Sequence, residues 1–472
     1  MKPRKPKGTQ AVLVAHSTVD AISINMEEGR GYRAIALLKA TSDYTGGTES
    51  MGTGLGRISQ LVSEYPDRKL QTLMHLVNTE TLKGIHNRQD KNKAYGVDRV
   101  TKTEYEENVD ENLKNLVARM KQFSYRPQPA RRTKIPKDGS NQTRPLGIPA
   151  YEDRLVQGAM ADILTAIYEP KFYDCSYGFR AGRGCHQALE ALDKILWGGT
   201  NWVVDADIKS FFDTVDHEWL MKFLEHDIGD KNFLRYVKRF LKSGIMEEGK
   251  YYDTDTGVPQ GGLISPVLAN VYLHYVIDRW FAKVIKTVSK GNAEMIRYAD
   301  DVVFCFEQEG DAKGFYEALK ERLKKFGLEL SEDKSQIIKF GRKAGSEAGK
   351  FDFLGFTHIT AESRQGKFYV KRITSQKKLK AKRQRAKKWL KENMHTPIKV
   401  LIDKLNVKLQ GHYNYYGITG NYAALNGLRE YVLDRLRATL NRRGASKDIS
   451  YEVFRRILSA HPVVQPRIVH RV

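Results

Sequence analysis

Two adjacent carboxylates, Asp300 and Asp301, interrupt an apolar run of β-prone residues, and they constrain the fold of this chain more than any other feature. Ile296 to Tyr298 precede them and Val302 to Phe306 follow them. Such residues favour strands, so we predict a β-hairpin whose tip carries both carboxylates. Neighbouring ionised carboxylates repel each other unless a cation neutralises them. Hard oxygen ligands of this kind favour Mg²⁺ or Mn²⁺, and the hairpin therefore predicts a metal site.

A third carboxylate is expected from the segment Trp202 to Asp213. As a strand, this segment places apolar residues on one face and Asp205 and Asp207 on the other. Asp207 stands at the end of the predicted strand and meets the acidic hairpin if the two strands are neighbours. The alternative is that these aspartates are solvated or helix-capping residues. The nearby acidic hairpin weighs against that alternative.

The net charge of +23, from 79 Lys+Arg against 56 Asp+Glu, indicates a polyanionic partner. Nucleic acid is the simplest such partner, and an anionic membrane surface is the other. No apolar run approaches the roughly 20 residues of a membrane-spanning helix, and the N-terminus has no apolar signal core. We therefore expect a soluble, intracellular protein. The three cysteines form no CxxC pair, which argues against a disulfide framework or a zinc ribbon.

The 472 residues are sufficient for several domains. Residues 1–69 are expected to form an N-terminal extension that includes a flexible, glycine-rich linker between Tyr44 and Arg57. Apolar residues recur at helical spacing in residues 70–125. Two extended segments around the polar loop 138–142 then predict a basic hairpin.

Two further helices are predicted downstream. Residues 312–326 place Phe315, Leu319 and Leu323 on one face, and Gly327 is well placed to end that helix. Residues 371–391 are rich in Lys and Arg and contain no acidic residue. The cations of this second segment recur around a helix.

Seven motifs follow one another along the chain. In order they are Arg144 to Pro149, Tyr177 to Arg180, Asp207 with Phe211-Phe212, Gly257 to Gly262 with Ser265-Pro266, Tyr298 to Asp301, Gly327 to Leu330 with Asp333-Lys334, and Phe353 to Phe356. This ordered series resembles the reverse transcriptases, and more narrowly the reverse transcriptase/maturase proteins of bacterial group II introns. The resemblance covers about residues 70–472. Because the chain ends at Val472 and has no paired cysteines, we expect a form without the HNH-type endonuclease of many relatives.

The resemblance implies a right-hand polymerase of the α+β class, with fingers, palm and thumb. The palm is expected to be an antiparallel sheet, and the thumb, or maturase domain, is expected to be helical. The implied division assigns residues 70–150 to the fingers, with the basic hairpin. It assigns residues 151–360 to the palm and the remainder of the fingers, and residues 371–472 to the thumb.

The resemblance also implies the chemistry of an RNA-directed DNA polymerase. Two Mg²⁺ ions, or Mn²⁺, would be bridged by Asp207 and Asp300, with Asp301 more peripheral. These ions would hold a deoxynucleoside triphosphate and activate the primer 3′-hydroxyl.

Five other residues match substrate-binding positions of the family. Lys137 and Arg144 match cations that grip the triphosphate, although Lys134 remains an alternative to Lys137 and a generic basic hairpin remains possible. Phe212 matches a bulky side chain under the sugar that excludes a 2′-hydroxyl, with an ordinary core role as its alternative. Gln260 matches a contact to the nascent base pair, and Lys334 matches a lysine near the active site.

The C-terminal region is implied to bind RNA. A phosphate backbone relieves the self-repulsion of a cation run through counterion release. Tyr and His rings can stack on RNA bases, but they can equally pack between helices, and both readings stay open. The residues assigned to RNA binding are Lys378, Lys382, Arg383, Arg385, Lys388, His412 and Tyr415.

The expected protein therefore copies an RNA template from a DNA primer with deoxynucleoside triphosphates, binds group II intron RNA and assists its splicing. It acts on target DNA during retromobility, in the bacterial cytoplasm and without a membrane. One alternative is an RNA-binding splicing factor whose polymerase is vestigial. Another is a domesticated or CRISPR-associated reverse transcriptase in defence or repair. The sequence carries no indication of oligomeric state.

Overall fold

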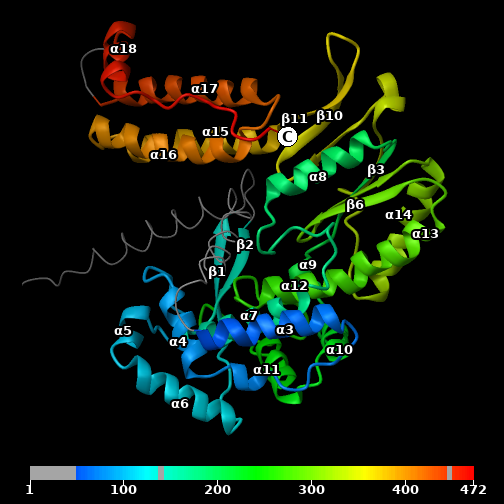
Figure 1. The fold of residues 1–472 in the computed structure, drawn as a ribbon. Coiled ribbons are helices and arrows are strands. Elements are labelled where there is room, and N and C mark those ends of the chain that lie inside the picture. The colour runs from blue at the N-terminus through cyan, green and yellow to red at the C-terminus, as the bar shows by residue number, and fades with distance from the viewer. Residues whose placement is uncertain (1–48, 137–142, 444–448, 472) are drawn as a thin grey trace, which may run out of the picture.

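The computed structural model describes residues 49–136, 143–443 and 449–471. Helices surround three β-sheets within this part of the chain. Figure 1 shows the four C-terminal helices at one end of the molecule, the N-terminal helices at the other end, and the sheets between them. Among the helices of these ranges, none combines the length and the apolar character needed to span a bilayer.

The central sheet has the strand order β6-β7-β3-β8, and all neighbouring strands are antiparallel. The predicted acidic hairpin is confirmed, because β6 and β7 pair along their whole length around a turn at Ala299 and Asp300. The strands are β3 (Trp202–Asp207), β6 (Ala293–Tyr298), β7 (Asp301–Phe306) and β8 (Gln336–Lys339).

Side chains alternate along each strand and so point to both faces of this sheet, and both faces are buried by other elements. On one face, Phe304 packs against Phe315 of α14 (Glu309–Lys325), with ring centroids 4.5 Å apart. On the other face, Val303 and Cys305 share a core with α8 (Cys185–Trp197). The predicted amphipathic helix is thus confirmed as α14, and Gly327 follows it with φ of +69°.

The basic hairpin belongs to a second sheet, of order β2-β1-β4-β5. Its strands β1 (Ala130–Pro136) and β2 (Thr143–Ile148) pair in antiparallel register as predicted. Strand β4 (Ile245–Glu247) runs parallel to β1, and β5 (Lys250–Tyr252) completes the sheet. Residues 137–142, which join β1 to β2, lie outside the described residues.

The prediction of a flexible linker up to Arg57 is wrong for its second half, because α3 (Glu49–Glu64) contains Gly52, Gly54 and Gly56. Ile58 and Val62 of this helix are buried, and Ser59 Oγ donates to the Ala166 carbonyl of α7 (Tyr151–Tyr168) at 2.9 Å. A glycine costs about 1 kcal/mol in a helix relative to alanine. Apolar spacing and packing on α7 outweigh that cost. Residues 44–48 lie outside the described residues.

The prediction of helices in residues 70–125 is confirmed by η1 (Met74–Leu76), α4 (Thr79–Arg88), α5 (Lys102–Glu106) and α6 (Val109–Lys121). Further helices lie between β3 and β6 in the sequence. They are α9 (Phe211–Thr214), α10 (His217–Asp227), α11 (Lys231–Leu241), α12 (Ser265–Leu273), the π-helical η2 (His274–Asp278) and η3 (Phe281–Ile285), and α13 (Lys286–Val288).

The C-terminal part begins with a third, antiparallel sheet of order β11-β10-β9 and continues into helices. The boundary expected at residue 371 falls inside β11, so residues 371–374 are strand and the cation-rich helix begins at Gln376. The elements are η4 (Arg342–Glu347), β9 (Lys350–Phe353), β10 (Phe356–Glu362), β11 (Phe368–Thr374), α15 (Gln376–Glu392), α16 (Ile398–Tyr416), α17 (Tyr422–Asn441) and α18 (Tyr451–Ala460).

Candidate active site

The acidic residues meet at one end of the central sheet. Strand β3 lies beside β7, and the register places Asp207 directly opposite Asp301. Directly opposed residues of antiparallel strands have Cβ atoms about 4.5–5.5 Å apart. Asp300 occupies the turn that leads into β7, and all three aspartates are half-buried. The predicted encounter between Asp207 and the acidic hairpin is therefore confirmed.

Asp205 is a fourth carboxylate of this cluster that we did not include among the predicted site residues. Burial, together with the charges of Asp301 and Asp207, raises its pKa to about 7. The alternation of β3 had already placed Asp205 and Asp207 on one face. That alternation is the signal that could have identified it.

The donor set fits a divalent cation of the Mg²⁺ type. The crowded carboxylates supply hard oxygens, and a cation between them would relieve their mutual repulsion. Among the residues that the structure describes, no group of three or more His, Cys, Asp or Glu side chains is placed so that it could hold a metal ion by itself. Mg²⁺ is usually bound by one or two carboxylates together with substrate phosphates, so an open set of this kind is suitable.

Lys334 lies beside Asp207, as expected for a lysine near the site. Its Nζ atom is 2.9 Å from Asp207 Oδ2, and 68% of the Lys334 side chain is exposed. The segment 331–335, which carries Lys334, also holds the backbone of Asp207. Ser331 N donates to the Asp207 carbonyl at 2.8 Å, and Asp207 N donates to Ser335 Oγ at 3.1 Å. An exposed ion pair contributes about 1 kcal/mol or less, so this ammonium can leave Asp207 at little cost.

The acidic turn rests on an unusually close backbone contact. Ala299 has φ of +55°, a left-handed conformation that is uncommon for a residue with a Cβ atom. A Cβ atom added to Gly178 would lie 2.3 Å from Ala299 N, so only glycine fits there. Asn270 Nδ2 donates to the Gly178 carbonyl at 2.8 Å. The turn that presents Asp300 is thus supported directly from behind.

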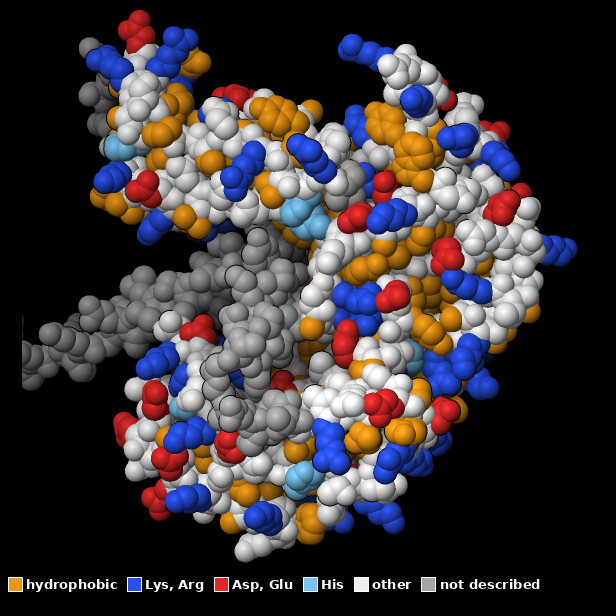
Figure 2. All heavy atoms as spheres, in the orientation of Figure 1, with side chains coloured by type: hydrophobic (Ala, Val, Ile, Leu, Met, Phe, Trp, Pro, Cys, Tyr) orange, Lys and Arg blue, Asp and Glu red, His pale blue; other side chains and the backbone are white. Residues whose placement is uncertain are grey.

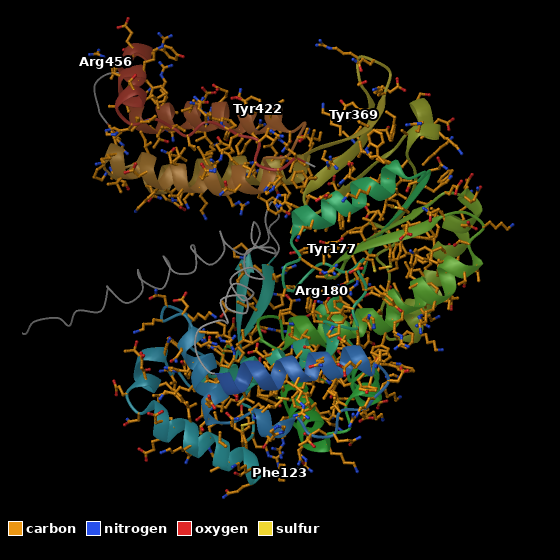
Figure 3. The ribbon with its side chains drawn as sticks, viewed as in Figure 1. Phe123, Tyr177, Arg180, Tyr369, Tyr422 and Arg456 are labelled. Atoms are coloured by element: carbon orange, nitrogen blue, oxygen red, sulfur yellow. The ribbon has the colours of Figure 1, made fainter. Side chains whose placement is uncertain are left out.

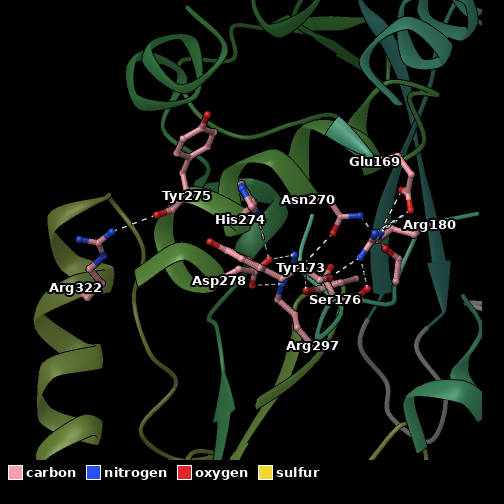
Figure 4. Close-up of polar contacts among 12 residues, drawn as sticks. Glu169, Tyr173, Ser176, Arg180, Asn270, His274, Tyr275, Asp278, Arg297 and Arg322 are labelled. Atoms are coloured by element: carbon pink, nitrogen blue, oxygen red, sulfur yellow. Dashed lines mark hydrogen bonds and ion pairs between the residues drawn. The ribbon is translucent and has the colours of Figure 1, made fainter. Parts of the chain in front are cut away.

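Arg297, which is fully buried, ties this support together (Figure 4). Its Nε and Nη2 atoms donate to the two carboxylate oxygens of Asp278 at 2.7 and 2.6 Å. Its Nη1 atom donates to Asn270 Oδ1 at 2.9 Å and to the Ala299 carbonyl at 3.1 Å. His274 also lies near Asp278, but burial lowers the pKa of His274 to about 4, so it is neutral near pH 7. Arg297 is therefore the counter-charge of Asp278.

A second buried guanidinium, that of Arg180, holds the neighbouring loop (Figure 4). It forms a fork with Glu169 and donates from Nη1 to the carbonyls of Tyr173 and Ser176, both at 2.7 Å. We predicted neither buried guanidinium as part of a site. The signal for Arg297 was a lone cation inside an apolar strand, which must find a carboxylate when buried.

The loop that carries Gln260 joins two predicted substrate-binding regions. Val258 N donates to the Phe212 carbonyl at 2.8 Å, and Gly147 N of β2 donates to the Gln260 carbonyl at 2.6 Å. Phe212 is half-buried, whereas its neighbour Phe211 is buried in the core. Phe212 nevertheless packs against the same core as Phe211, so its core role and its predicted contact with the sugar both stay open.

Of the two cations predicted on the basic hairpin, one lies within the residues that the structure describes. Arg144 is exposed on β2, opposite Ile135. Lys137 lies outside the described residues. Lys134, the alternative to Lys137, has its Nζ atom 2.8 Å from Glu247 Oε1 on the neighbouring strand.

The predicted RNA-binding cations of α15 divide into two groups. Lys378, Lys382, Arg383 and Arg385 are half-buried, and Lys388 is exposed. Arg383 turns toward α17, where its Cζ atom lies 5.5 Å from the Tyr431 ring centroid. Only part of the cation run therefore faces solvent.

His412 and Tyr415 are both buried. Tyr415 Oη donates to the Leu354 carbonyl at 2.9 Å, and the His412 ring centroid lies 4.6 Å from that of Tyr416. These positions fit the packing alternative. Contact of either ring with RNA stays a prediction, and the burial of both rings argues against it.

Two known protein families match this chain, one over the segment that contains the acidic cluster and the other over the C-terminal helices. The family described as "Reverse transcriptase (RNA-dependent DNA polymerase)" matches residues 135–358. The family described as "Group II intron, maturase-specific domain" matches residues 379–458.

Individual relatives extend this comparison. Protein YkfC of Escherichia coli K12 is 32% identical over 360 residues, which cover 66% of this chain and 89% of YkfC. The group II intron-encoded protein LtrA of Lactococcus lactis subsp. cremoris is 45% identical over 165 residues, which cover 35% of this chain and only 27% of LtrA. A putative COX1/OXI3 intron 1 protein of Saccharomyces cerevisiae is 35% identical over 168 residues, which cover 35% of this chain and 20% of that protein.

Proposed function

We propose that this chain, which belongs to the reverse transcriptase and maturase family of group II introns, is an RNA-directed DNA polymerase that also binds intron RNA and assists its splicing. One observation carries the proposal. Asp207 and Asp301 are opposed across β3 and β7, and Asp300 stands in the adjoining turn. This cluster lies inside the part of the chain that the reverse transcriptase family matches.

Asp207 and Asp300 are the residues that would hold two Mg²⁺ ions, with Asp301 at the periphery. When bound, such ions lower the pKa of a primer hydroxyl and stabilise the charge of a transferring phosphoryl group. Arg144, exposed on β2, offers the bidentate donor geometry that suits the triphosphate. Lys334 neutralises Asp207 in the absence of substrate, and its exposed ammonium can turn toward phosphate oxygens when they arrive.

The right-hand arrangement follows from the same reasoning. The central sheet would be the palm, the basic hairpin with α4 to α6 the fingers, and α15 to α18 the thumb. An RNA template with its DNA primer would lie across the acidic turn. Figure 2 shows Lys and Arg side chains at both ends of the molecule, with Asp and Glu among them. The net charge of +23 suits nucleic acid partners that include intron RNA and target DNA.

Phe212 is expected to select deoxynucleotides. Replacing it with alanine would remove the side chain proposed to meet a 2′-hydroxyl, and preference for dTTP over UTP should fall by about 10²-fold. The measurement is kcat/KM for both nucleotides on an oligo(dT) primer with a poly(rA) template. Phe211→Leu is the comparison variant: the Phe211 ring lies edge to face against that of Phe212, with centroids 5.3 Å apart, so this change shows how much of the effect comes from altered packing alone. An unchanged ratio in folded Phe212→Ala protein would leave Phe212 with a packing role alone.

The proposed function is tested in two arms with the purified full chain. In the first, a labelled DNA primer on an RNA template should be extended to full length with deoxynucleotides and Mg²⁺, and a chelator should stop the reaction. In the second, the chain should accelerate excision of its cognate group II intron at limiting Mg²⁺. Splicing assistance without extension would support the vestigial-polymerase alternative instead.

A further inference from the structure

The outer face of α11 carries a stripe of four exposed cations that the proposed function does not use. They follow one another at intervals of four, three and four residues, so they lie on one side of the helix. The opposite side is buried, and α11 contains no acidic residue. We call this set the α11 stripe: Lys231, Arg235, Lys238 and the C-cap residue Lys242.

The stripe is not explained by stabilisation of the fold. None of its four cations forms an ion pair within the residues that the structure describes. Asp230, which precedes Lys231 in the sequence, has other partners: it accepts from Leu73 N and Met74 N at 2.7 and 2.8 Å and also caps α11. Lys231 stands in the first helical turn, where the helix dipole disfavours a cation.

An aromatic ring is fixed beside the stripe. Phe123 is 36% exposed and has φ of +57°, which is strained for a bulky residue. Arg239 holds this turn by donating to the carbonyls of Tyr125 and Phe123 at 2.8 and 3.0 Å. The Arg235 guanidinium lies 4.2 Å from the Phe123 ring centroid. One stripe residue thus already stacks on the ring.

This surface lies outside the candidate active site. Figure 3 places Phe123 at the end of the molecule opposite Tyr422 of α17. Figure 1 shows α6 and α11 at that same end, away from the β6–β7 hairpin. A ligand on the α11 stripe would therefore leave the acidic turn accessible.

We propose that the α11 stripe and Phe123 form a second RNA-binding surface, which takes a single-stranded segment while another nucleic acid occupies the active site. This inference rests on the proposed function, since it assumes that RNA is the partner. Lys231 and Lys242 are separated by about 16 Å along the helix axis. That length corresponds to about five nucleotides of a strand at ~3.4 Å each. The partly exposed Phe123 ring, on which Arg235 stacks, suits an unpaired base, which a membrane surface does not offer.

The test compares two triple variants of the full chain with equal loss of charge. One is Lys231→Gln/Lys238→Gln/Lys242→Gln in the stripe. The matched control is Lys313→Gln/Lys320→Gln/Lys324→Gln on α14, where Lys313 and Lys320 already have carboxylate partners. Each protein is first saturated with an unlabelled DNA primer on an RNA template. Binding of a fluorescent 12-nucleotide oligo(A) RNA is then measured by anisotropy over a range of salt concentrations.

The stripe variant should bind the oligo(A) probe on the order of 100-fold more weakly at 0.1 M salt, and the slope of log K against log salt should fall by about 2, because three phosphate contacts contribute ~0.7 each. The control variant should change little. Phe123→Ala should weaken binding about tenfold with an unchanged salt slope, since stacking releases no counterions. Primer extension should be unaffected in all three.

Three results would overturn the inference. An equal loss of oligo(A) binding in both triple variants would show that binding depends only on the net charge of the protein. Unchanged binding in the stripe variant would make the stripe a solvated face. Loss of binding to phosphatidylserine vesicles with unchanged oligo(A) binding would assign the surface to membranes. If instead the wild type binds the probe through the stripe but extends no primer, the proposed polymerase function fails and the second surface stands.

Discussion

Asp300→Asn is expected to lower the rate of RNA-templated primer extension by about 10³-fold or more, because a lost metal ligand costs several kcal/mol of transition-state stabilisation. The change keeps the size of the side chain and removes its charge. Asp300 is half-buried in the turn beside Asp301, so two carboxylates of like charge are adjacent there. The variant should therefore unfold at the same temperature as the wild type or a higher one.

The activity loss is measured as single-turnover extension, and thermal unfolding is followed on the same samples. Asp213→Asn is the matched control, since Asp213 is exposed on α9, close in sequence to Asp207 but outside the acidic cluster. It should retain activity within about twofold, as a surface substitution normally does. Asp301→Asn should fall between the two. Wild-type activity in Asp300→Asn would remove this residue from the site.

Asp278→Ala is expected to destabilise the protein by about 3–5 kcal/mol, because it leaves the Arg297 guanidinium buried without its counter-charge. Both side chains are fully buried, and the fork between them has distances of 2.7 and 2.6 Å. Urea denaturation measures the free energy of unfolding. Asp174→Ala is the control, because it breaks an ion pair with Arg183 in which the Asp174 side chain is 95% exposed. That change should cost about 1 kcal/mol or less.

A double variant separates folding from positioning of the acidic turn. Asp278→Leu/Arg297→Met replaces the buried ion pair with apolar side chains, which often restores stability. It does not restore the donor to the Ala299 carbonyl. We therefore expect much of the stability to return while primer extension stays impaired, with the loss in kcat rather than in KM. Recovery of both quantities would limit Arg297 to a structural role.

The local parts of the site were predictable from the sequence. Alternation of apolar residues and aspartates in β3 and β7 indicated two strands whose carboxylates share one end, and the register confirms this. The spacing of Phe315, Leu319 and Leu323 likewise predicted α14. These predictions succeeded because strand and helix periodicities depend on neighbouring residues.

The parts that failed or were missed depend on distant contacts. The glycines of α3 indicated a linker, but α3 is helical because it packs on α7, about a hundred residues away in sequence. Neither Gly178 behind Ala299 nor Asp278 opposite Arg297 could be paired without the fold. Composition also did not distinguish a ring that stacks on RNA from one that packs between helices. Only the buried hydrogen bond from Tyr415 to the Leu354 carbonyl shows that this ring packs inside the protein.

Asp207 is joined to the acidic hairpin across β3 and β7, and we propose that it is part of a polymerase centre. The most direct test is incorporation of one deoxynucleotide onto a labelled DNA primer opposite an RNA template, with wild type and Asp207→Asn side by side. We predict an extended primer for the wild type when Mg²⁺ is present, none when it is chelated, and none for the variant. Extension by folded Asp207→Asn at the wild-type rate would contradict the claim.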